Sequence, residues 1–146
     1  MLHRKLSCEY IRGLVEGEGS FTFSAWRRTE KRVPSFQIKM HARNIDLLRG
    51  IRDELGLKNK VYVYHYPGHD GAKRGPQAML IVREIGSLKN TIIPLFYNKL
   101  AGNRAFEFEN WLERIGGDPW VPESYKILYR LHKNGYYRKN TPRFRQ

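Results

Sequence analysis

The amino-acid sequence predicts an α+β domain in which helices cover one face of a four-stranded antiparallel sheet. The chain has 146 residues, which suits one domain with one hydrophobic core. Four short segments alternate apolar and polar residues, as half-buried strands do, and they occur in two consecutive pairs. Segments with helical apolar spacing separate and follow these pairs. The order is therefore α-β-β-α-β-β-α-α, followed by a short helix and a tail, and all strands pair as hairpins.

The chain starts with a helix and a hairpin. Residues 7–18 predict a helix that Ser7 can cap, and an apolar stripe runs along one face of it. Residues 20–29 then switch to a period of two, which is typical of a strand. A charged turn at residues 31–34 leads to a second alternating segment at residues 35–42. These two segments are expected to form the first hairpin.

The second hairpin follows another helix. Residues 44–55 have helical spacing, and Gly56 can end that helix. Residues 60–66 and 77–84 alternate as strands, joined by a loop rich in Gly and Pro. In the first of these strands the valines are expected to face the helices and the tyrosines to face away. The inward valines are Val61 and Val63, and the outward tyrosines are Tyr62, Tyr64 and Tyr66.

Three further helices are predicted after the second hairpin. A short one starts near Ser87 and is expected to end before Pro94. A longer one covers residues 103–115, and a break rich in Gly and Pro follows it. The last starts near Pro122 and ends near Gly135.

The balance of charges points to a polyanionic partner. The chain holds 27 Lys and Arg against 14 Asp and Glu, a formal charge of +13. The lone cysteine, Cys8, excludes an intramolecular disulfide framework and favours a reducing compartment. No apolar run approaches the roughly 20 residues that cross a bilayer, so a membrane role is not expected. We expect an intracellular protein, in the cytoplasm or nucleoid of a prokaryote or in an organelle.

The sheet face turned away from the helices is the candidate DNA-binding surface. It mixes hydroxyls, an amide, aromatic rings and cations, which suits contact with phosphates and base edges. An ordinary solvated face is the alternative, although such a face would hold fewer large aromatic residues. The candidate residues are Ser20, Thr22, Ser24, Trp26, Arg28, Gln37, Lys39, His41, Tyr62, Tyr64, Met79, Ile81 and Arg83.

The C-terminal segment from Lys126 onward contains seven Lys and Arg and no acidic residue. It is either a solvated basic tail or a segment held against a phosphate backbone. In the second case Lys139 and Arg143 join the DNA-binding residues.

The end of the first helix combines small and acidic residues in an unusual way. Gly13 and Gly17 lie on one helical stripe, and each costs about 1 kcal/mol relative to Ala, which suggests that another backbone approaches there. Glu16 and Glu18 stand where carboxylates oppose the helix dipole, so they do not serve helix stability. With the carbonyls freed at the helix end, they offer oxygen ligands for Mg²⁺. An exposed charged helix end without a role is the alternative.

The segment Ile11–Gly19, with its Ser20-Phe21 continuation, resembles the motif of the LAGLIDADG homing endonucleases. The sequence IRGLVEGEG follows that motif position by position, except that Arg12 replaces an alanine and both acids are Glu. The resemblance extends over roughly residues 7–115. It implies the αββαββα fold with a saddle-shaped sheet, as found in single-motif, intron-encoded members of the family.

The resemblance divides the chain into two segments. Residues 1–117 are the expected endonuclease domain. Residues 118–146 form a C-terminal helix and basic tail, expected to belong to the same domain.

The resemblance also implies an assembly and an activity. The first helices of two copies would pack through Gly13, Leu14 and Gly17, giving a homodimer. Each subunit would cut one strand of a long pseudo-palindromic DNA site, leaving short 3′ overhangs. The alternative is an RNA maturase, with intron RNA as its partner, or a DNA-binding regulator that uses the fold without cleavage.

The same resemblance assigns the active-site residues. Glu18 would be the catalytic, metal-binding carboxylate, and the Gly17 carbonyl a second ligand for Mg²⁺ or Mn²⁺. Glu16 matches the first acid of the motif, which supports the helix end rather than the metal. Lys99 matches the basic active-site residue, with a surface lysine as the alternative. Met40 stands where the family often has a glutamine, and Lys39 or His41 would compensate.

Overall fold

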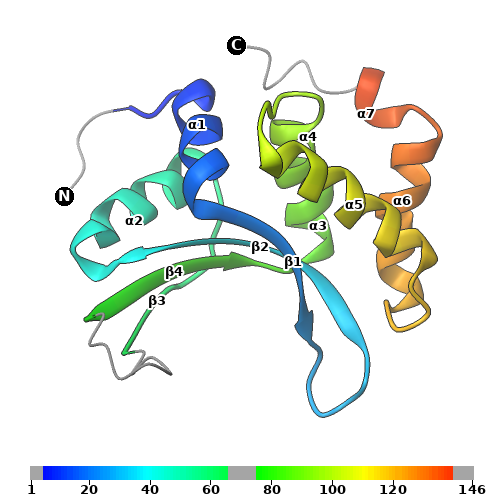
Figure 1. Cartoon of the computed structure of the whole chain (residues 1–146), viewed down its shortest axis with the longest axis horizontal. Coiled ribbons are helices and arrows are strands. Elements are labelled where there is room, and N and C mark those ends of the chain that lie inside the picture. The colour runs from blue at the N-terminus through cyan, green and yellow to red at the C-terminus, as the bar shows by residue number, and fades with distance from the viewer. Residues whose placement is uncertain (1–4, 66–74, 140–146) are drawn as a thin grey trace.

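The structure, a computed structural model, describes residues 5–65 and 75–139 (Figure 1). Its strands are β1 (Gly19–Ala25), β2 (Arg32–His41), β3 (Val61–His65) and β4 (Pro76–Val82). Its longer helices are α1 (Cys8–Glu18), α2 (Ile45–Glu54), α5 (Asn103–Gly117) and α6 (Lys126–Lys133). Its shorter helical segments are η1 (Ala42–Asn44), α3 (Ile85–Ser87), η2 (Leu88–Ile92), α4 (Ile93–Phe96), η3 (Glu123–Tyr125) and α7 (Tyr136–Lys139). Tyr66 and Arg143, both named in the predictions, lie outside the described residues.

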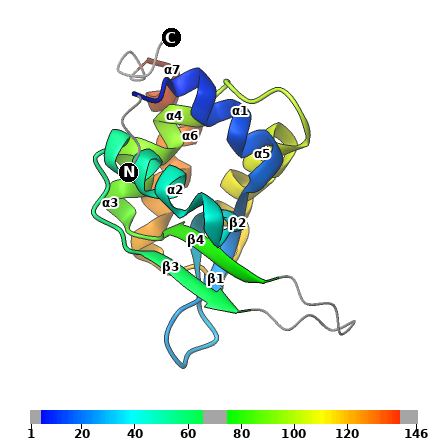
Figure 2. The same ribbon diagram turned by 90° about the vertical axis from the view of Figure 1, so that its left-hand side faces the viewer.

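The four strands form one antiparallel sheet in the order β1-β2-β4-β3. The helices lie on one side of this sheet, and the other side is open and curved (Figures 1 and 2). The predicted α+β class, the hairpin pairing and the single helical layer are thus confirmed. No helix in the described ranges is both long and apolar enough to cross a membrane.

A cluster of aromatic rings holds the start of β1 against the helices. Phe21 packs on Phe36, Phe96, Phe108 and Trp111, with ring centroids 4.9 to 5.5 Å away. Such pairs contribute about 0.5–1.5 kcal/mol each beyond the area they bury. Two strands and two helices therefore meet at one residue.

Helix α5 also bonds directly to β1, which is the terminal strand of the sheet. The Phe21 amide donates to the Glu107 carboxylate at 3.2 Å, and Trp111 Nε1 donates to the Thr22 carbonyl at 2.8 Å. The Arg114 guanidinium lies 4.4 Å from the centre of the Phe23 ring. Helix α5 therefore covers the strand that continues from α1.

The first hairpin differs from its prediction at both strand ends. Strand β1 ends at Ala25, so Trp26 and Arg28 lie in the turn and not on a strand face. Arg27 has a φ of 56°, a left-handed conformation that breaks the extended chain. Strand β2 begins at Arg32 and includes Pro34. A proline is tolerated there because β4 pairs with β2 only from Phe36 onward.

The predicted helix end before Pro94 is wrong. Residues 85–96 are helical throughout, in α3, η2 and α4. Segment η2 is a π-helix, whose wider turn joins the Ile93 amide to the Leu88 carbonyl. Pro94 thus falls in the first turn of α4, where a missing amide hydrogen is tolerated.

The valine pattern of β3 holds only in part. Val61 is buried, but Val63 is 51% exposed. Strand β3 is at the sheet edge, so the helical layer does not cover its far end.

The segment after residue 118 packs against the helical layer. Leu128 of α6 is buried, whereas Ile127 and Leu131 are only half-buried. Tyr137 of α7 is fully buried, and its hydroxyl donates to the Lys89 carbonyl at 3.2 Å. Burial raises the pKa of Tyr137, so the hydroxyl stays protonated as a donor. The boundary at 117/118 stays a prediction.

Candidate active site and nucleic-acid interface

Helix α1 places two acids at its C-terminal end, beside the sheet. Ser7 Oγ accepts the Tyr10 amide at 3.0 Å and caps the start, while Ile11 and Val15 are fully buried. Gly19, the first residue of β1, directly follows the helix, and a Cβ there would come within 2.6 Å of Val15 Cγ1. Glu18 is therefore the last helical residue, and its side chain is exposed.

The stripe of Gly13 and Gly17 faces no other part of the described chain. Both glycines are exposed, and a Cβ at either would have no described atom within 4 Å. Tyr10, one turn before Gly13, is 48% exposed, and Leu14 is half-buried. The close approach that the sequence predicts is thus not made inside the described part of the chain.

Arg12, which departs from the motif, has a structural role. The residue is only 6% exposed, and its Nε donates to the Leu95 carbonyl at 2.7 Å. This bond joins α1 to α4, and a charged donor to a buried carbonyl is among the stronger hydrogen bonds. An arginine is accommodated there because α4 presents a carbonyl to it.

Glu16 joins the end of α1 to the loop that carries Lys99. Its carboxylate accepts the backbone amides of Ala101 and Gly102, the latter at 3.2 Å. The sequence comparison assigned Glu16 only to the helix end, but the contact extends to the loop after α4. Hydrogen bonds from two backbone amides thus engage the Glu16 carboxylate. Glu18, in contrast, has no hydrogen bond or ion pair with any described residue.

The loop after α4 is anchored on its other side as well. The Tyr97 hydroxyl lies 2.7 Å from His132 Nδ1 of α6, and burial raises the pKa of this tyrosine. Asn98 has a φ of 57°, and the Lys99 amide donates to the Phe96 carbonyl at 3.0 Å. Lys99 itself is exposed. The structure therefore holds Lys99 in a tight turn close to the end of α1.

The strand register brings most of the predicted DNA-binding residues together on the open face. One row across β3, β4 and β2 is Tyr62, Met79 and Lys39. A second row is Tyr64, Gln77 and His41, and a third row continues to β1 as Ile81, Gln37 and Ser20. The sequence reasoning missed Gln77, although its position two residues before Met79 places it on this face.

Hydroxyl groups continue the open face along the first hairpin. Thr22 lies opposite Ser35, and Ser24 donates to the Ser35 hydroxyl at 2.9 Å. His41 Nδ1 accepts the Arg43 amide at 3.0 Å, so this ring caps η1 at the end of β2. Hydrogen bonds therefore fix both serines and the His41 ring.

Other predicted residues lie away from these rows. Trp26 is 37% exposed in the turn, and the Arg27 guanidinium lies 5.6 Å from its ring. Arg83 follows β4, and its carbonyl accepts the Tyr125 hydroxyl at 2.7 Å. Lys139 lies on α7, in the helical layer and away from the open face (Figure 1).

Comparison with known proteins agrees with the motif. The profile of the LAGLIDADG endonuclease family matches residues 11–115, which is more than half of the chain. The chain belongs to this family. No curated protein matches it.

Solved structures share the fold of this LAGLIDADG protein. The meganuclease I-SmaMI bound to uncleaveable DNA has a TM-score of 0.59 at 21% identity, covering 88% of this chain and 45% of its own. I-GzeII in complex with its DNA target has a TM-score of 0.60 at 19% identity, covering 100% and 47%. I-LtrWI bound to target DNA has a TM-score of 0.58 at 22% identity, covering 92% and 40%. The present chain therefore spans less than half the length of each.

The end of α1 carries oxygen donors, but the described residues do not form a complete metal site. Among the described residues, no cluster of three or more His, Cys, Asp or Glu side chains could hold an ion. Glu18 contributes one exposed carboxylate, and the end of the helix contributes carbonyls. These hard oxygen donors fit Mg²⁺, which usually keeps several waters and takes only one or two protein carboxylates.

The residue that would replace the family's glutamine does not face the site. Met40 lies on the same side of β2 as Phe36 and Ile38 and packs half-buried against the core. Its neighbour Lys39 is exposed on the open face. The sequence suggests Lys39 or His41 in place of the family's glutamine. The His41 ring already accepts a hydrogen bond that caps η1, which leaves Lys39 as the better candidate.

Proposed function

We propose that this LAGLIDADG protein is a site-specific, Mg²⁺-dependent DNA endonuclease of the intron-homing type. It acts as a homodimer on a long pseudo-palindromic duplex. Each subunit cuts one strand, and the cuts leave short 3′ overhangs. The observation that carries this proposal is the position of Glu18, an exposed carboxylate at the end of α1 beside the open, polar sheet face, with no partner among the described residues.

Two observations support the proposed dimer: an uncovered surface on α1 and the length of the similar structures. The unfilled Gly13 and Gly17 stripe and the exposed Tyr10 ring form a surface on α1 that a second α1 could cover. The similar structures are about twice as long as this chain, so a second copy would supply the other half. The dimer would bring two Glu18 carboxylates near one axis and complete the metal sites.

DNA would lie along the curved open face of the sheet. The rows through Lys39, Gln37 and His41 offer a cation, an amide and an imidazole at successive positions along β2. The net charge of +13 supplies the long-range attraction to phosphates. Such binding weakens with salt, by about 0.9 log unit per log unit of salt for each neutralised phosphate.

Three residues then divide the chemical work. Glu18, with a helix-end carbonyl, would hold the Mg²⁺ ion, which supplies an activated water and stabilises the leaving 3′ oxygen. Lys99 stabilises negative charge on the scissile phosphate. Glu16 positions the Lys99 loop through the Ala101 and Gly102 amides. The sheet orients the duplex so that its phosphate meets these groups.

Cleavage selection on a random duplex library with Mg²⁺ tests the activity and identifies the site. We expect cutting with Mg²⁺ and none with EDTA. On the selected site, Glu18→Gln should lower the cutting rate by about 10²- to 10³-fold or more while duplex binding persists. Glu9→Gln is the matched control, because Glu9 is an exposed acid at the other end of the same helix. Normal cutting by Glu18→Gln would show that the assignment is wrong, and binding without cutting would favour a regulator.

Light scattering on the purified protein tests the dimer. Gly13→Leu and Gly17→Leu should shift the mass toward the monomer, because the two backbones could no longer approach. Gly117→Leu is the control, since that glycine is also exposed at a helix end with nothing within 4 Å of an added Cβ. Dimers that persist in both α1 variants would exclude packing through this stripe.

A further inference from the structure

A polar cavity lies between the β1–β2 turn and the loop that follows α5. Its volume is about 590 Å³, within the range of small-ligand sites. It is lined by Ala25, Thr29, Glu30, Lys31, Arg32, Arg114, Asp118 and Trp120. Three cations and two acids thus surround one large aromatic ring.

The register places this cavity on the helical side of the hairpin. Ala25 and Arg32 are opposite each other and share the sheet side of Phe21 and Phe23. The Arg32 amide donates to the Trp120 carbonyl at 3.0 Å, which ties the loop to β2 on that side. A duplex that lies on the open face would therefore leave this cavity unoccupied.

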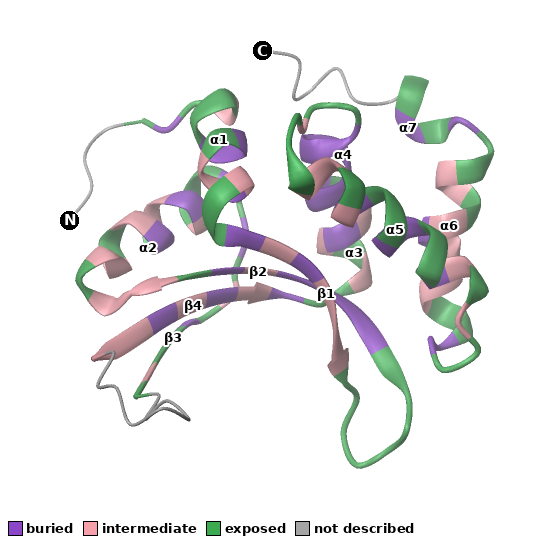
Figure 3. Cartoon of the chain, in the orientation of Figure 1, coloured by how far each residue is buried: buried purple, intermediate pink, exposed green. Residues whose placement is uncertain are grey.

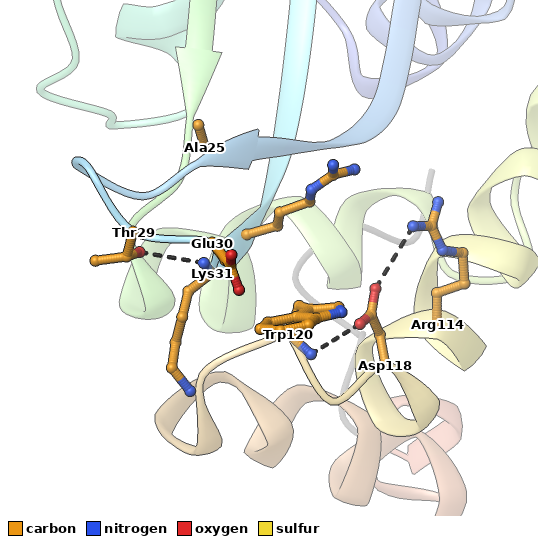
Figure 4. A pocket seen from close by; sticks show the side chains of 8 residues that line it. Ala25, Thr29, Glu30, Lys31, Arg114, Asp118 and Trp120 are labelled. Atoms are coloured by element: carbon orange, nitrogen blue, oxygen red, sulfur yellow. Dashed lines mark hydrogen bonds and ion pairs between the residues drawn. The ribbon is translucent and has the colours of Figure 1, made fainter.

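Trp120 presents its ring to the cavity. Its side chain is 50% exposed, although the loop backbone around it is bonded in place. Figure 4 shows the ring between the turn that carries Glu30 and Lys31 and the helix end that carries Arg114 and Asp118. The indole is thus accessible, and it stands on a loop whose backbone is hydrogen-bonded in place.

The charges around Trp120 are only partly neutralised. The Asp118 carboxylate accepts the Trp120 amide at 2.8 Å and lies 3.6 Å from the Arg114 guanidinium. Lys31 and Arg32 are exposed, and neither side chain forms an ion pair or hydrogen bond with another described residue. Glu30 is the one acid of the lining that opposes them. The cavity therefore keeps a net positive charge beside an open aromatic face.

An aromatic platform next to unpaired cations suits a base with its phosphates. In a duplex the faces of the bases are stacked on their neighbours, whereas a single strand can splay a base out and stack it on a protein ring. We propose that this cavity binds single-stranded nucleic acid, with a base stacked on Trp120 and flanking phosphates on Lys31 and Arg32. The site does not depend on cleavage, because it uses neither Glu18 nor the open sheet face.

Fluorescence anisotropy with the full chain tests the site, with EDTA present so that no strand is cut. The probes are oligouridine RNA and oligothymidine DNA of about 12 nucleotides, and a random-sequence duplex. Trp120→Ala should weaken single-strand binding by about fivefold or more. It should leave duplex binding unchanged. Trp26→Ala, the matched control, should weaken duplex binding and leave single-strand binding unchanged.

Variants of the cavity charges give an independent readout that needs no change to the ring. Lys31→Gln should weaken single-strand binding and reduce its salt dependence, whereas Glu30→Gln should strengthen binding. Tighter binding of the RNA probe would assign the site to RNA through the 2′-hydroxyl, and equal binding would assign it to either sugar. The proposal is overturned if Trp120→Ala and Lys31→Gln both leave single-strand affinity unchanged. It is overturned as well if Trp120→Ala weakens duplex binding equally.

Discussion

At its start, β1 is fixed by α5 and by the rings around Phe21, whereas at its end it passes into a turn whose residues 26–31 are all exposed (Figure 3). Glu107 and Trp111 bond to the first residues of the strand. Beyond Ala25, the Arg32 amide donates to the Trp120 carbonyl in the loop that follows α5.

The difference matches what each end has to do under the proposed function. A reaction slows when its reacting groups are misplaced by about 1 Å. The end of β1 beside Glu18 therefore benefits from a rigid surrounding structure. A turn that contacts DNA benefits from freedom to adapt, because side chains and loops adjust on binding. One seven-residue strand therefore connects a fixed region to an adaptable one.

The largest loss of stability should come from removing the packing of α5 against the start of β1. Trp111→Ala deletes a buried ring and its bond to Thr22, and it should lower the free energy of unfolding by about 3–5 kcal/mol. Urea unfolding followed by circular dichroism measures this loss. Trp120→Ala is the control, since the same change at a half-exposed tryptophan should cost far less. Equal losses would show that the two ends of β1 are held equally.

A smaller effect, on rate alone, should follow from loosening the Lys99 loop. Glu16→Ala removes the acceptor of two loop amides and should lower the single-turnover cutting rate by about 10- to 100-fold. Duplex affinity should stay near that of the unmodified protein, because Glu16 does not lie on the open face. Glu9→Ala is the control for loss of an α1 carboxylate. A variant that cuts normally would show that Glu16 does not position the site.

The smallest effect should come from the exposed turn. Trp26→Ala should change the free energy of unfolding by no more than about 0.5 kcal/mol, because the residue is exposed. It should nevertheless lower duplex affinity several-fold if the turn contacts DNA. Thermal melting and duplex binding on one preparation separate the two effects. A large stability loss would contradict the contrast between the two ends of β1.

The sequence predicts the elements that local chemistry specifies. Ser7, the apolar stripe of α1 and Gly56 with its φ of 69° act within a few residues, and the structure has each as expected. The period-two segments likewise predict the two hairpins. The assignment of Glu18 as a metal ligand depends on the motif alone. The structure of one chain does not test it.

The errors occur where distant segments decide the outcome. Pro94 reads as a helix end, but a π-turn lets the helix continue beneath the sheet. Pro34 is predicted in a turn, but it pairs with Phe23 of β1 and so lies in β2, where β4 pairs only from Phe36 onward. The contacts of Arg12 with Leu95 and of Glu16 with Gly102 join residues more than 80 positions apart. No spacing in the sequence encodes such partners.

The bond from Glu107 to the Phe21 amide has a further consequence, for solubility. An unpaired outer edge of a terminal strand is a template for strands from other molecules. Helix α5 blocks that edge of β1, whereas β3, at the opposite edge, is short, and Lys60, the residue before it, lies over the Tyr62 ring. A substitution that detaches α5 would therefore expose an aggregation-prone edge strand and also destabilise the fold. Such variants should accumulate as aggregates during expression before they can be studied as unfolded chains.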